Sequence, residues 1–170
     1  LEAAASLGYR VEERPIPVRD SGRLASVFMT DQRNPGNLPL SHLNYKDIRD
    51  QNQVFSEVAA FSFAQANWSN GNAAEQVSLQ VVSGNYFDVL GTQLAQGRGF
   101  LPDEDIKATP VIVVSDGFWQ RSLGGDPAIV GKTLLLNGHP FTIIGVTPPE
   151  FFGSVVGEAP DFWAPWMMSE

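Results

Sequence analysis

One continuous stretch carries most of the structural signals in this 170-residue chain; residues 81–152 are VVSGNYFDVLGTQLAQGRGFLPDEDIKATPVIVVSDGFWQRSLGGDPAIVGKTLLLNGHPFTIIGVTPPEFF. The apolar run 111–114 predicts a strand that is buried on both faces. Residues 132–136 and 141–146 flank Asn137-Gly138, the strongest local hairpin signal of the chain. Strands, short helices and turns thus follow one another closely, and the stretch leaves little room for an active site.

The same signals continue on both sides of this stretch. Ser41 is a plausible N-cap of an amphipathic helix that contains Tyr45 and Ile48 and continues toward Phe55 and Val58, with a break near 51–53. Further elements are predicted from apolar patterns and turn residues: strands at 24–30 and 161–167, a hairpin of 61–68 and 75–82 around Asn70-Gly71, and short helices at 84–90 and 116–123. We therefore expect an α+β fold with mixed or antiparallel sheets and a few short helices.

The N-terminal residues give weaker signals. Residues 1–23 are mixed in character and contain Pro15 and Pro17, so we expect a poorly ordered leader or an extended approach to the first strand. The domain itself is expected to span 24–170 and to divide into two subdomains. Because the first methionine is Met29, we expect a processed or excised chain whose targeting or anchoring segment lies elsewhere.

Composition excludes several classes of protein. The net charge of −8 repels phosphate backbones, so nucleic acid is not an expected partner. Without cysteine, the chain has neither disulfides nor thiolate metal ligands. Its apolar runs are far shorter than the ~20 residues of a membrane-spanning helix, and no phosphate-binding glycine motif is present.

Two groups of residues suggest chemistry but lack the necessary pattern. Asp103, Glu104 and Asp105 offer oxygens to a hard cation, yet they lack the spacing of a calcium loop, which favours a solvated loop and no metal. Ser115, Asp116 and His139 are the residue types of a hydrolase triad, without the Gly-x-Ser-x-Gly elbow. We expect Ser115 to cap a helix, and neither catalysis nor a cofactor.

Aromatic and apolar residues supply the remaining candidate sites. Exposed tryptophans at 68, 163 and 166 would suit an alternative function, that of a stand-alone periplasmic protein that binds a small molecule or glycan. After Pro148-Pro149, an apolar segment punctuated by glycines contains four candidate contact residues: Phe151, Phe152, Val155 and Val156. Exposed apolar patches usually mark contacts, so this segment, together with the acidic loop 102–109, is the expected interaction surface.

The order of these motifs resembles the MacB-like periplasmic core domain of FtsX-like ABC-transporter permeases. The resemblance lies in Ser83-Gly84-Asn85-Tyr86-Phe87, Gly97-Arg98-Gly99-Phe100, 111–115, Gly124-Gly125-Asp126-Pro127 and 131–151, and it extends to 15–24 and Leu40-Ser41. It is closest to the large permeases of this group that carry no fused ATPase domain. Two departures are visible: Thr92 to Gln96 replace the usual approach to Gly97, and the chain stops before the element that returns to the membrane-proximal part.

This resemblance implies a fold, a location and partners. The fold would have a membrane-proximal, porter-like part and a projecting subdomain, both outside the inner membrane of a bacterium. A cytoplasmic ATPase subunit would move the transmembrane helices of the parent permease, and this domain would transmit the change and dock a periplasmic adaptor or envelope protein, for export or signalling. A homodimer of the full-length protein is also implied, and no catalytic residues are carried over.

Overall fold

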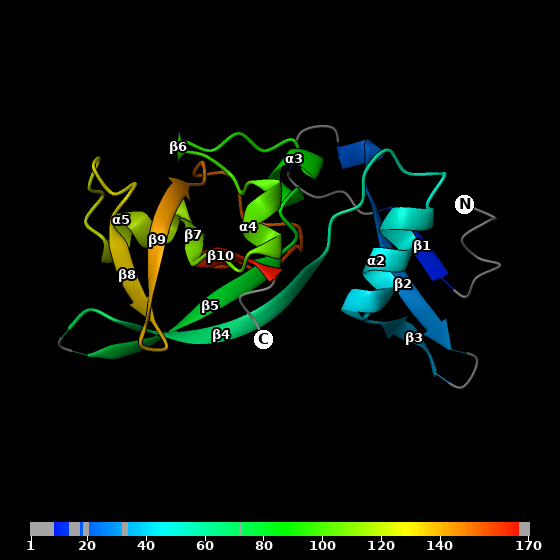
Figure 1. Cartoon of the computed structure of the whole chain (residues 1–170), viewed down its shortest axis with the longest axis horizontal. Coiled ribbons are helices and arrows are strands. Elements are labelled where there is room, and N and C mark those ends of the chain that lie inside the picture. Colours follow the sequence, from blue (N-terminus) through cyan, green and yellow to red (C-terminus); the bar gives the residue numbers. More distant parts are fainter. Residues whose placement is uncertain (1–8, 14–17, 19–20, 32–33, 72, 167–170) are drawn as a thin grey trace. The chain divides into compact units, whose positions relative to one another are not determined.

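The computed structural model describes residues 9–13, 18, 21–31, 34–71 and 73–166 (Figure 1). The chain divides into two compact units. The first holds Leu1–Ile16 and Asp20–Val58, and the second holds Pro17–Arg19 and Ala59–Glu170. Each unit has a sheet of its own.

The first unit contains a three-stranded antiparallel sheet in the order β1 (Tyr9–Glu13), β2 (Ala25–Asp31) and β3 (Asn34–Leu38). A 3-10 turn, Ser21–Arg23, precedes β2. β1 lies within the segment that we expected to be a leader, and all five of its residues pair with β2. The prolines that suggested a leader follow this strand, and residues 1–8, 14–17 and 19–20 lie outside the described part.

The helix of the first unit, α2 (His42–Gln51), begins with a capping box. Ser41 Oγ accepts the backbone N–H of Asn44, and the Asn44 side chain accepts the backbone N–H of Ser41. The helix ends at Asn52, whose carboxamide oxygen accepts the N–H groups of the two residues that lead away from it, Val54 and Phe55. The break expected near 51–53 is therefore the end of the helix, because the Asn52 side chain offers the backbone a non-helical partner.

The second unit is built on one mixed sheet. Its strands are β4 (Phe61–Ser69), β5 (Ala74–Val82), β6 (Gln96–Gly97), β7 (Val111–Val114), β8 (Thr133–Leu136), β9 (His139–Val146) and β10 (Phe162–Pro165). The order is β6-β9-β7-β10-β5-β4-β8, and a further pairing joins β8 to β9, so the sheet closes on itself as a ring. Two pairings, β7–β9 and β5–β10, are parallel and the others are antiparallel. The expected α+β fold with a mixed sheet is confirmed.

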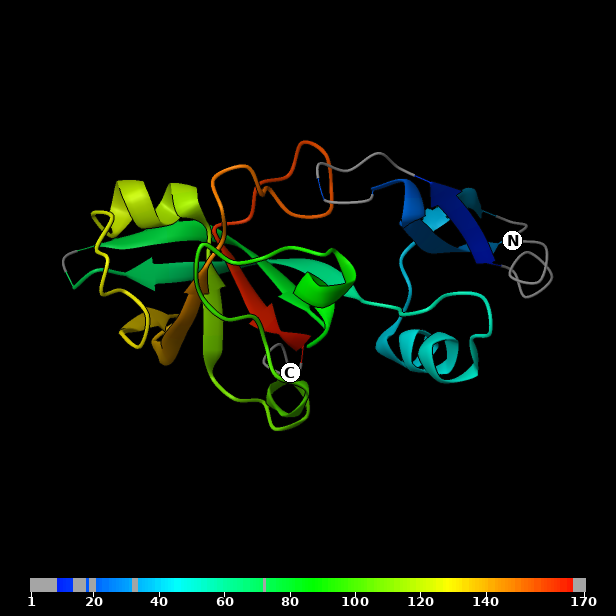
Figure 2. The ribbon, with the colours of Figure 1, turned by 90° about the horizontal axis from the view of Figure 1, so that it is seen from above.

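In the described part of this unit, three short helices accompany the sheet: α3 (Tyr86–Val89), α4 (Pro102–Ile106) and α5 (Asp116–Ser122). Figure 2 shows α5 beside the long β4–β5 pair. Ser115 caps α5, since its Oγ accepts the backbone N–H of Phe118 at 3.1 Å. The predicted hairpins at Asn70-Gly71 and Asn137-Gly138 are both present, and Asn137 has a positive φ of 51°.

Apolar side chains cover both faces of the ring's central strands. The inner face forms a cluster that includes Trp68, Phe118 and Phe162. Because neighbouring strand residues point to opposite faces, Trp163 lies on the outer face, next to Gln80 in the register. There a second aromatic group packs around it, formed by Tyr86, Phe87, Phe100 and Phe151. Val111–Val114 are buried throughout, as predicted for a strand covered on both faces.

Candidate docking site

The two adjacent phenylalanines after β9 point in different directions. Phe151 is only 5% exposed, and its ring centroid lies 5.5 Å from that of Trp163 and 5.9 Å from that of Phe87. Phe152 is 55% exposed. Phe151 therefore belongs to the outer-face core and drops out of the expected contact surface, because its ring packs against Trp163 and Phe87 whereas Phe152 is left exposed.

Phe152 begins a small apolar hollow of about 240 Å³. We call it the 152–159 hollow, after the residues that line it: Phe152, Gly153, Val155, Val156, Gly157, Glu158 and Ala159. Val156, like Phe152, is strongly exposed. Pockets for drug-sized molecules occupy about 300–1,000 Å³, so the size of the hollow suits one or two protein side chains better than a complete ligand.

Hydrogen bonds hold the segment that forms the hollow against the buried aromatic group. The hydroxyl of Tyr86 lies 2.8 Å from Gln80 Oε1 and 2.9 Å from Ser154 Oγ. Since the Gln80 oxygen only accepts, Tyr86 donates to it and accepts from Ser154. Burial raises the pKa of Tyr86 to about 12, with the Ser154 hydrogen bond opposing that rise. A neutral tyrosine hydroxyl thus anchors Ser154, in the middle of the segment, to the buried aromatic group.

Gln80 is the buried polar residue beneath this segment, and it is fully inaccessible. Its Oε1 also accepts the indole N–H of Trp163 at 2.8 Å. The indole nitrogen is a donor only, so the carboxamide is held in this orientation. Gln80 Nε2 finds no acceptor among the described residues. The sequence signal for Gln80 was a polar side chain in an otherwise apolar strand end, and our sequence reasoning did not single it out.

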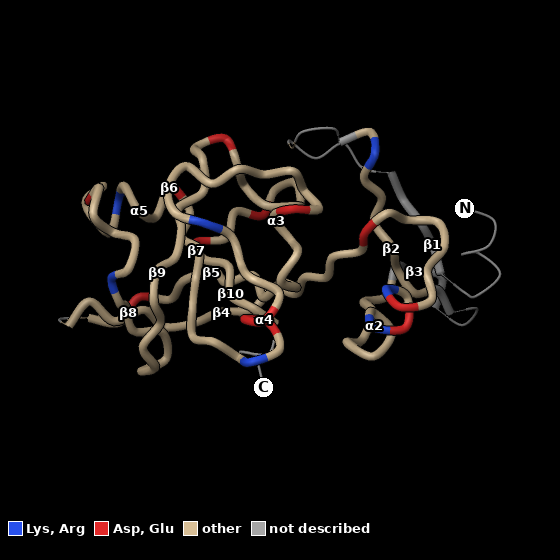
Figure 3. Tube along the Cα trace, turned by 45° about the horizontal axis from the view of Figure 1, so that its top comes forward, with Lys and Arg blue, Asp and Glu red and all other residues tan. Residues whose placement is uncertain are grey.

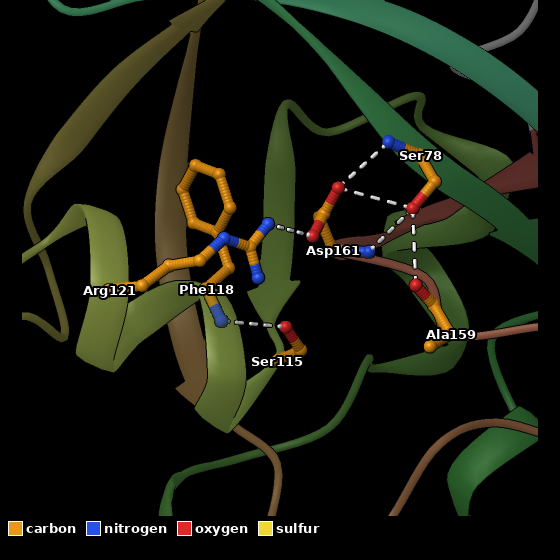
Figure 4. Close-up of polar contacts among 6 residues, drawn as sticks. All are labelled: Ser78, Ser115, Phe118, Arg121, Ala159 and Asp161. Carbon is orange, nitrogen blue, oxygen red and sulfur yellow. Dashed lines mark hydrogen bonds and ion pairs between the residues drawn. The ribbon is translucent and has the colours of Figure 1, made fainter.

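The far end of the segment is fixed by Asp161 (Figure 4). Asp161 Oδ2 accepts from the backbone N–H of Ser78 at 2.9 Å and from its Oγ at 3.1 Å, while Oδ1 accepts from Arg121 Nη2 at 2.6 Å. The backbone N–H of Ser115 donates to the carbonyl of Asp161 at 2.9 Å. One carboxylate therefore ties β5, α5 and the start of β10 together, which gives the 152–159 hollow a firm frame.

The three acidic candidates all lie on α4, where Figure 3 shows acidic positions. Exposed Asp103 pairs with Lys107 one helical turn later at 2.8 Å, and the hydrogen bond to this lysine lowers the pKa of Asp103. Asp105 Oδ2 accepts the backbone N–H of Gly84 at 3.2 Å. Among the described residues, no group of three or more acidic or histidine side chains is arranged to hold a metal ion.

Glu104 is the buried member of this trio. Its oxygens accept two hydrogen bonds from Arg98, at 2.7 and 2.9 Å, and a third from the backbone N–H of Leu101 at 2.8 Å. The hydrogen bond from Arg98 is the main cause that holds the pKa of Glu104 below its ordinary value. Glu104 therefore drops out of the expected interaction surface, because its charge is neutralised within the fold.

The residues of the suggested triad are far apart. Asp116, next to Ser115, donates its backbone N–H to Thr147 Oγ1 at 3.3 Å, and Thr147 is the residue that directly follows β9. His139 is the first residue of the same strand, at its opposite end. A strand rises about 3.3 Å per residue, so about 25 Å separates the two ends. The hydrolase hypothesis is wrong, because direct proton transfer needs about 3 Å.

The tryptophans proposed for a glycan site do not form one. Trp68 and Trp163 are buried in the inner and outer cores, and Trp166 is half-buried. Trp68 packs edge-on against Phe118 at 5.0 Å. The structure therefore does not favour a stand-alone binding protein that uses these side chains.

The fold is that of an α+β domain built on a mixed sheet that closes into a ring. The model of the MacB-like periplasmic core domain matches residues 5–170, so the chain belongs to this family. This membership places it outside the cytoplasm, as a domain of a bacterial inner-membrane permease. No helix among the described residues has the length and hydrophobicity to cross a bilayer.

Relatives and solved structures agree with this assignment. The chain is 30% identical over 131 residues to the macrolide export ATP-binding/permease protein MacB of Aggregatibacter actinomycetemcomitans, an alignment that covers 74% of this chain and 20% of that protein. It is 41% identical over 69 residues to the protein of the same name from Neisseria gonorrhoeae, and this alignment covers 41% of this chain and 11% of that protein. This chain thus spans about a fifth or less of these curated relatives.

Two solved structures share the fold. One is the periplasmic region of MacB from Actinobacillus actinomycetemcomitans, with a TM-score of 0.63 and 21% identity over 82% of this chain and 63% of the other. The second is the extracellular domain of the ABC-type transporter YknZ from Gram-positive bacteria, with a TM-score of 0.64 and 17% identity over 83% of this chain and 71% of the other. A domain of this kind has a role in transport that is in general not enzymatic.

Proposed function

We propose that this chain is the extracytoplasmic transmitting and docking domain of an ABC-type permease. Relatives named as ATP-binding/permease proteins support a parent that couples to a cytoplasmic ATPase. The domain itself performs no catalysis, and its contribution is mechanical. Movement of the transmembrane helices would shift the domain and whatever is bound to it, for export or signalling, and the full-length permease would act as a homodimer.

The observation that carries this proposal is the 152–159 hollow on its rigid frame. Exposed Phe152 and Val156 offer apolar contact area. Ser154, which lies between them in sequence, is hydrogen-bonded to buried Tyr86 of α3, and Asp161, which follows them, is hydrogen-bonded to Ser78 of β5. A partner that inserts a side chain into the hollow would therefore be coupled to the whole ring. We propose a periplasmic adaptor or envelope protein as that partner, with exposed Asp103 as part of the same or a neighbouring polar rim.

Site-specific photo-crosslinking in the full-length permease tests this proposal. A photoreactive residue at Val156 is expected to capture a partner protein from the cell envelope, and the same residue at Leu43 of the first unit serves as a control because both positions are about three-quarters exposed, at 73% and 74%. Capture at Val156 alone supports the docking site. Equal capture at both positions, or none at Val156, refutes it.

A further inference from the structure

Among the described residues, β4 has one of the strand edges that the ring of the second unit leaves open. β4 spans Phe61–Ser69, but β8 pairs with it only at Trp68 and Ser69. On its other side β4 pairs with β5 along its whole length. Residues 61–66 therefore have a neighbour strand on one side only, among the residues that the structure describes.

The backbone groups at this edge can be assigned from the hydrogen bonds at both ends of β4. The backbone carbonyl of Asn67 accepts the N–H of Asn137 at 2.8 Å, and the backbone N–H of Asn67 donates to Asn137 Oδ1 at 2.8 Å. Both backbone groups of Asn67 therefore point away from β5. In contrast, the carbonyl of Ala60 accepts the N–H of Ser83, which follows β5 directly. Ladder bonds alternate along an antiparallel strand. Phe61, Phe63 and Gln65 consequently direct their N–H and C=O groups to the open edge.

The side chains along this edge make it suitable for contact. Phe61 and Phe63 lie on one face of β4, with ring centroids 5.9 Å apart, and are 38% and 46% exposed. Residues 61–66, FSFAQA, contain no charge and no proline. Natural edge strands usually carry lysine, proline or a bulge that blocks the addition of another strand, and this one carries none of the three.

The net charge of the second unit indicates which chemical class of partner would suit this edge. Residues 59–71 and 73–166 contain ten acidic and four basic side chains, a net charge of −6. An acidic body attracts basic segments and repels a second copy of itself. A second copy is also disfavoured by size, because six residues of edge supply only a small part of the ~1,200–2,000 Å² of a stable interface.

We propose that residues 61–66 bind an extended, basic segment of a partner protein by strand addition. The partner's backbone would pair with Phe61, Phe63 and Gln65, and its alternate apolar side chains would cover the two phenyl rings. Its basic side chains would complement the acidic unit. This site is separate from the 152–159 hollow and does not depend on the function proposed for it.

The test uses the 170-residue chain and a synthetic ten-residue peptide of alternating valine and lysine. Amide hydrogen exchange, followed by NMR, is expected to slow at least ~10-fold at Phe61, Phe63 and Gln65 when the peptide is added, as expected for new backbone hydrogen bonds. A peptide of alternating valine and glutamate is expected to leave exchange unchanged.

Two matched variants locate the effect. Phe63→Lys places a charge on the edge and is expected to weaken peptide binding at least ~10-fold. Val130→Lys makes the same change at a position of similar exposure, 41%, outside the sheet, and is expected to bind like the parent chain. Protection at other amides, equal loss in both variants, or dimerisation of the chain through this edge in sedimentation experiments overturns the proposal.

Discussion

Replacing Glu104 by glutamine tests how strongly the stability of the second unit depends on this buried carboxylate of α4. Glu104 is 10% exposed and accepts three hydrogen bonds, two from Arg98 and one from Leu101. Glutamine keeps one acceptor oxygen and turns an NH₂ group toward the guanidinium. A hydrogen bond to a charged group contributes about 1.5–3 kcal/mol, but half-exposed Arg98 regains water. We expect Glu104→Gln to lower the free energy of unfolding by about 2 kcal/mol at pH 7.

The pH dependence of this loss distinguishes charge from packing. The hydrogen bond from Arg98 lowers the pKa of Glu104 in the folded chain, so the stabilisation is complete above the unfolded value of about 4.3 and disappears as the pH falls through the folded value. Glutamine resembles the protonated acid. The stability difference between the parent chain and Glu104→Gln is therefore expected to shrink toward zero in strongly acidic solution.

Urea unfolding followed by tryptophan fluorescence measures this difference at several pH values. All four tryptophans lie in the second unit, so the signal reports on the unit that contains Glu104. Asp103→Asn is the control, because the pair of Asp103 and Lys107 is exposed and solvent screens it. A loss that stays constant from neutral to acidic pH, or an equal loss in Asp103→Asn, would refute the reasoning.

Three further outcomes follow from burial and backbone geometry. Phe151→Ala is expected to cost about 3–5 kcal/mol in urea unfolding, whereas Phe152→Ala leaves stability nearly unchanged, and equal losses would contradict their opposite burial. Gly97→Ala places a Cβ in overlap with the carbonyl oxygen of Ile144, whereas the Cβ of Gly131→Ala has no atom within 4 Å, although both glycines have positive φ. The Gly97→Ala variant is therefore expected to unfold at a much lower urea concentration than Gly131→Ala. Because burial raises the pKa of Tyr86 to about 12, above its unfolded value of about 10, stability is expected to fall as the pH rises from 10 to 12. Absorbance at 295 nm measured against pH follows the ionisation of tyrosine and checks the raised pKa. In Tyr86→Phe, the part of the stability loss at alkaline pH that comes from Tyr86 should be absent.

Local signals were sufficient for most elements of the fold. Val111–Val114 form a strand covered on both faces, and Asn137-Gly138 form a hairpin turn, as their residue types predict. Ser41 and Ser115 cap α2 and α5. These features depend on backbone preferences and short-range hydrogen bonds, which are encoded within a few residues. β1 was missed because Pro15 and Pro17 outweighed the weak strand pattern before them.

The candidate site was only partly predictable. The sequence marked the apolar segment after Pro148-Pro149, but it did not separate Phe151 from Phe152, since burial of either depends on Phe87 and Trp163 from distant strands. Glu104 likewise looked like a surface charge until Arg98 was placed beside it.

By itself, the sequence determined the class of the fold, the caps of α2 and α5, the hairpin turns and the family resemblance, because each rests on residues that are neighbours in the chain. Only the tertiary structure decided that β8 joins β4 to β9 and closes the ring. It also decided that Gln80, Tyr86 and Ser154 form one hydrogen-bonded chain and that residues 61–66 keep an open edge. Pairings between strands far apart in sequence depend on loop closure and burial over the whole domain, and no local pattern specifies which partner a strand edge finds.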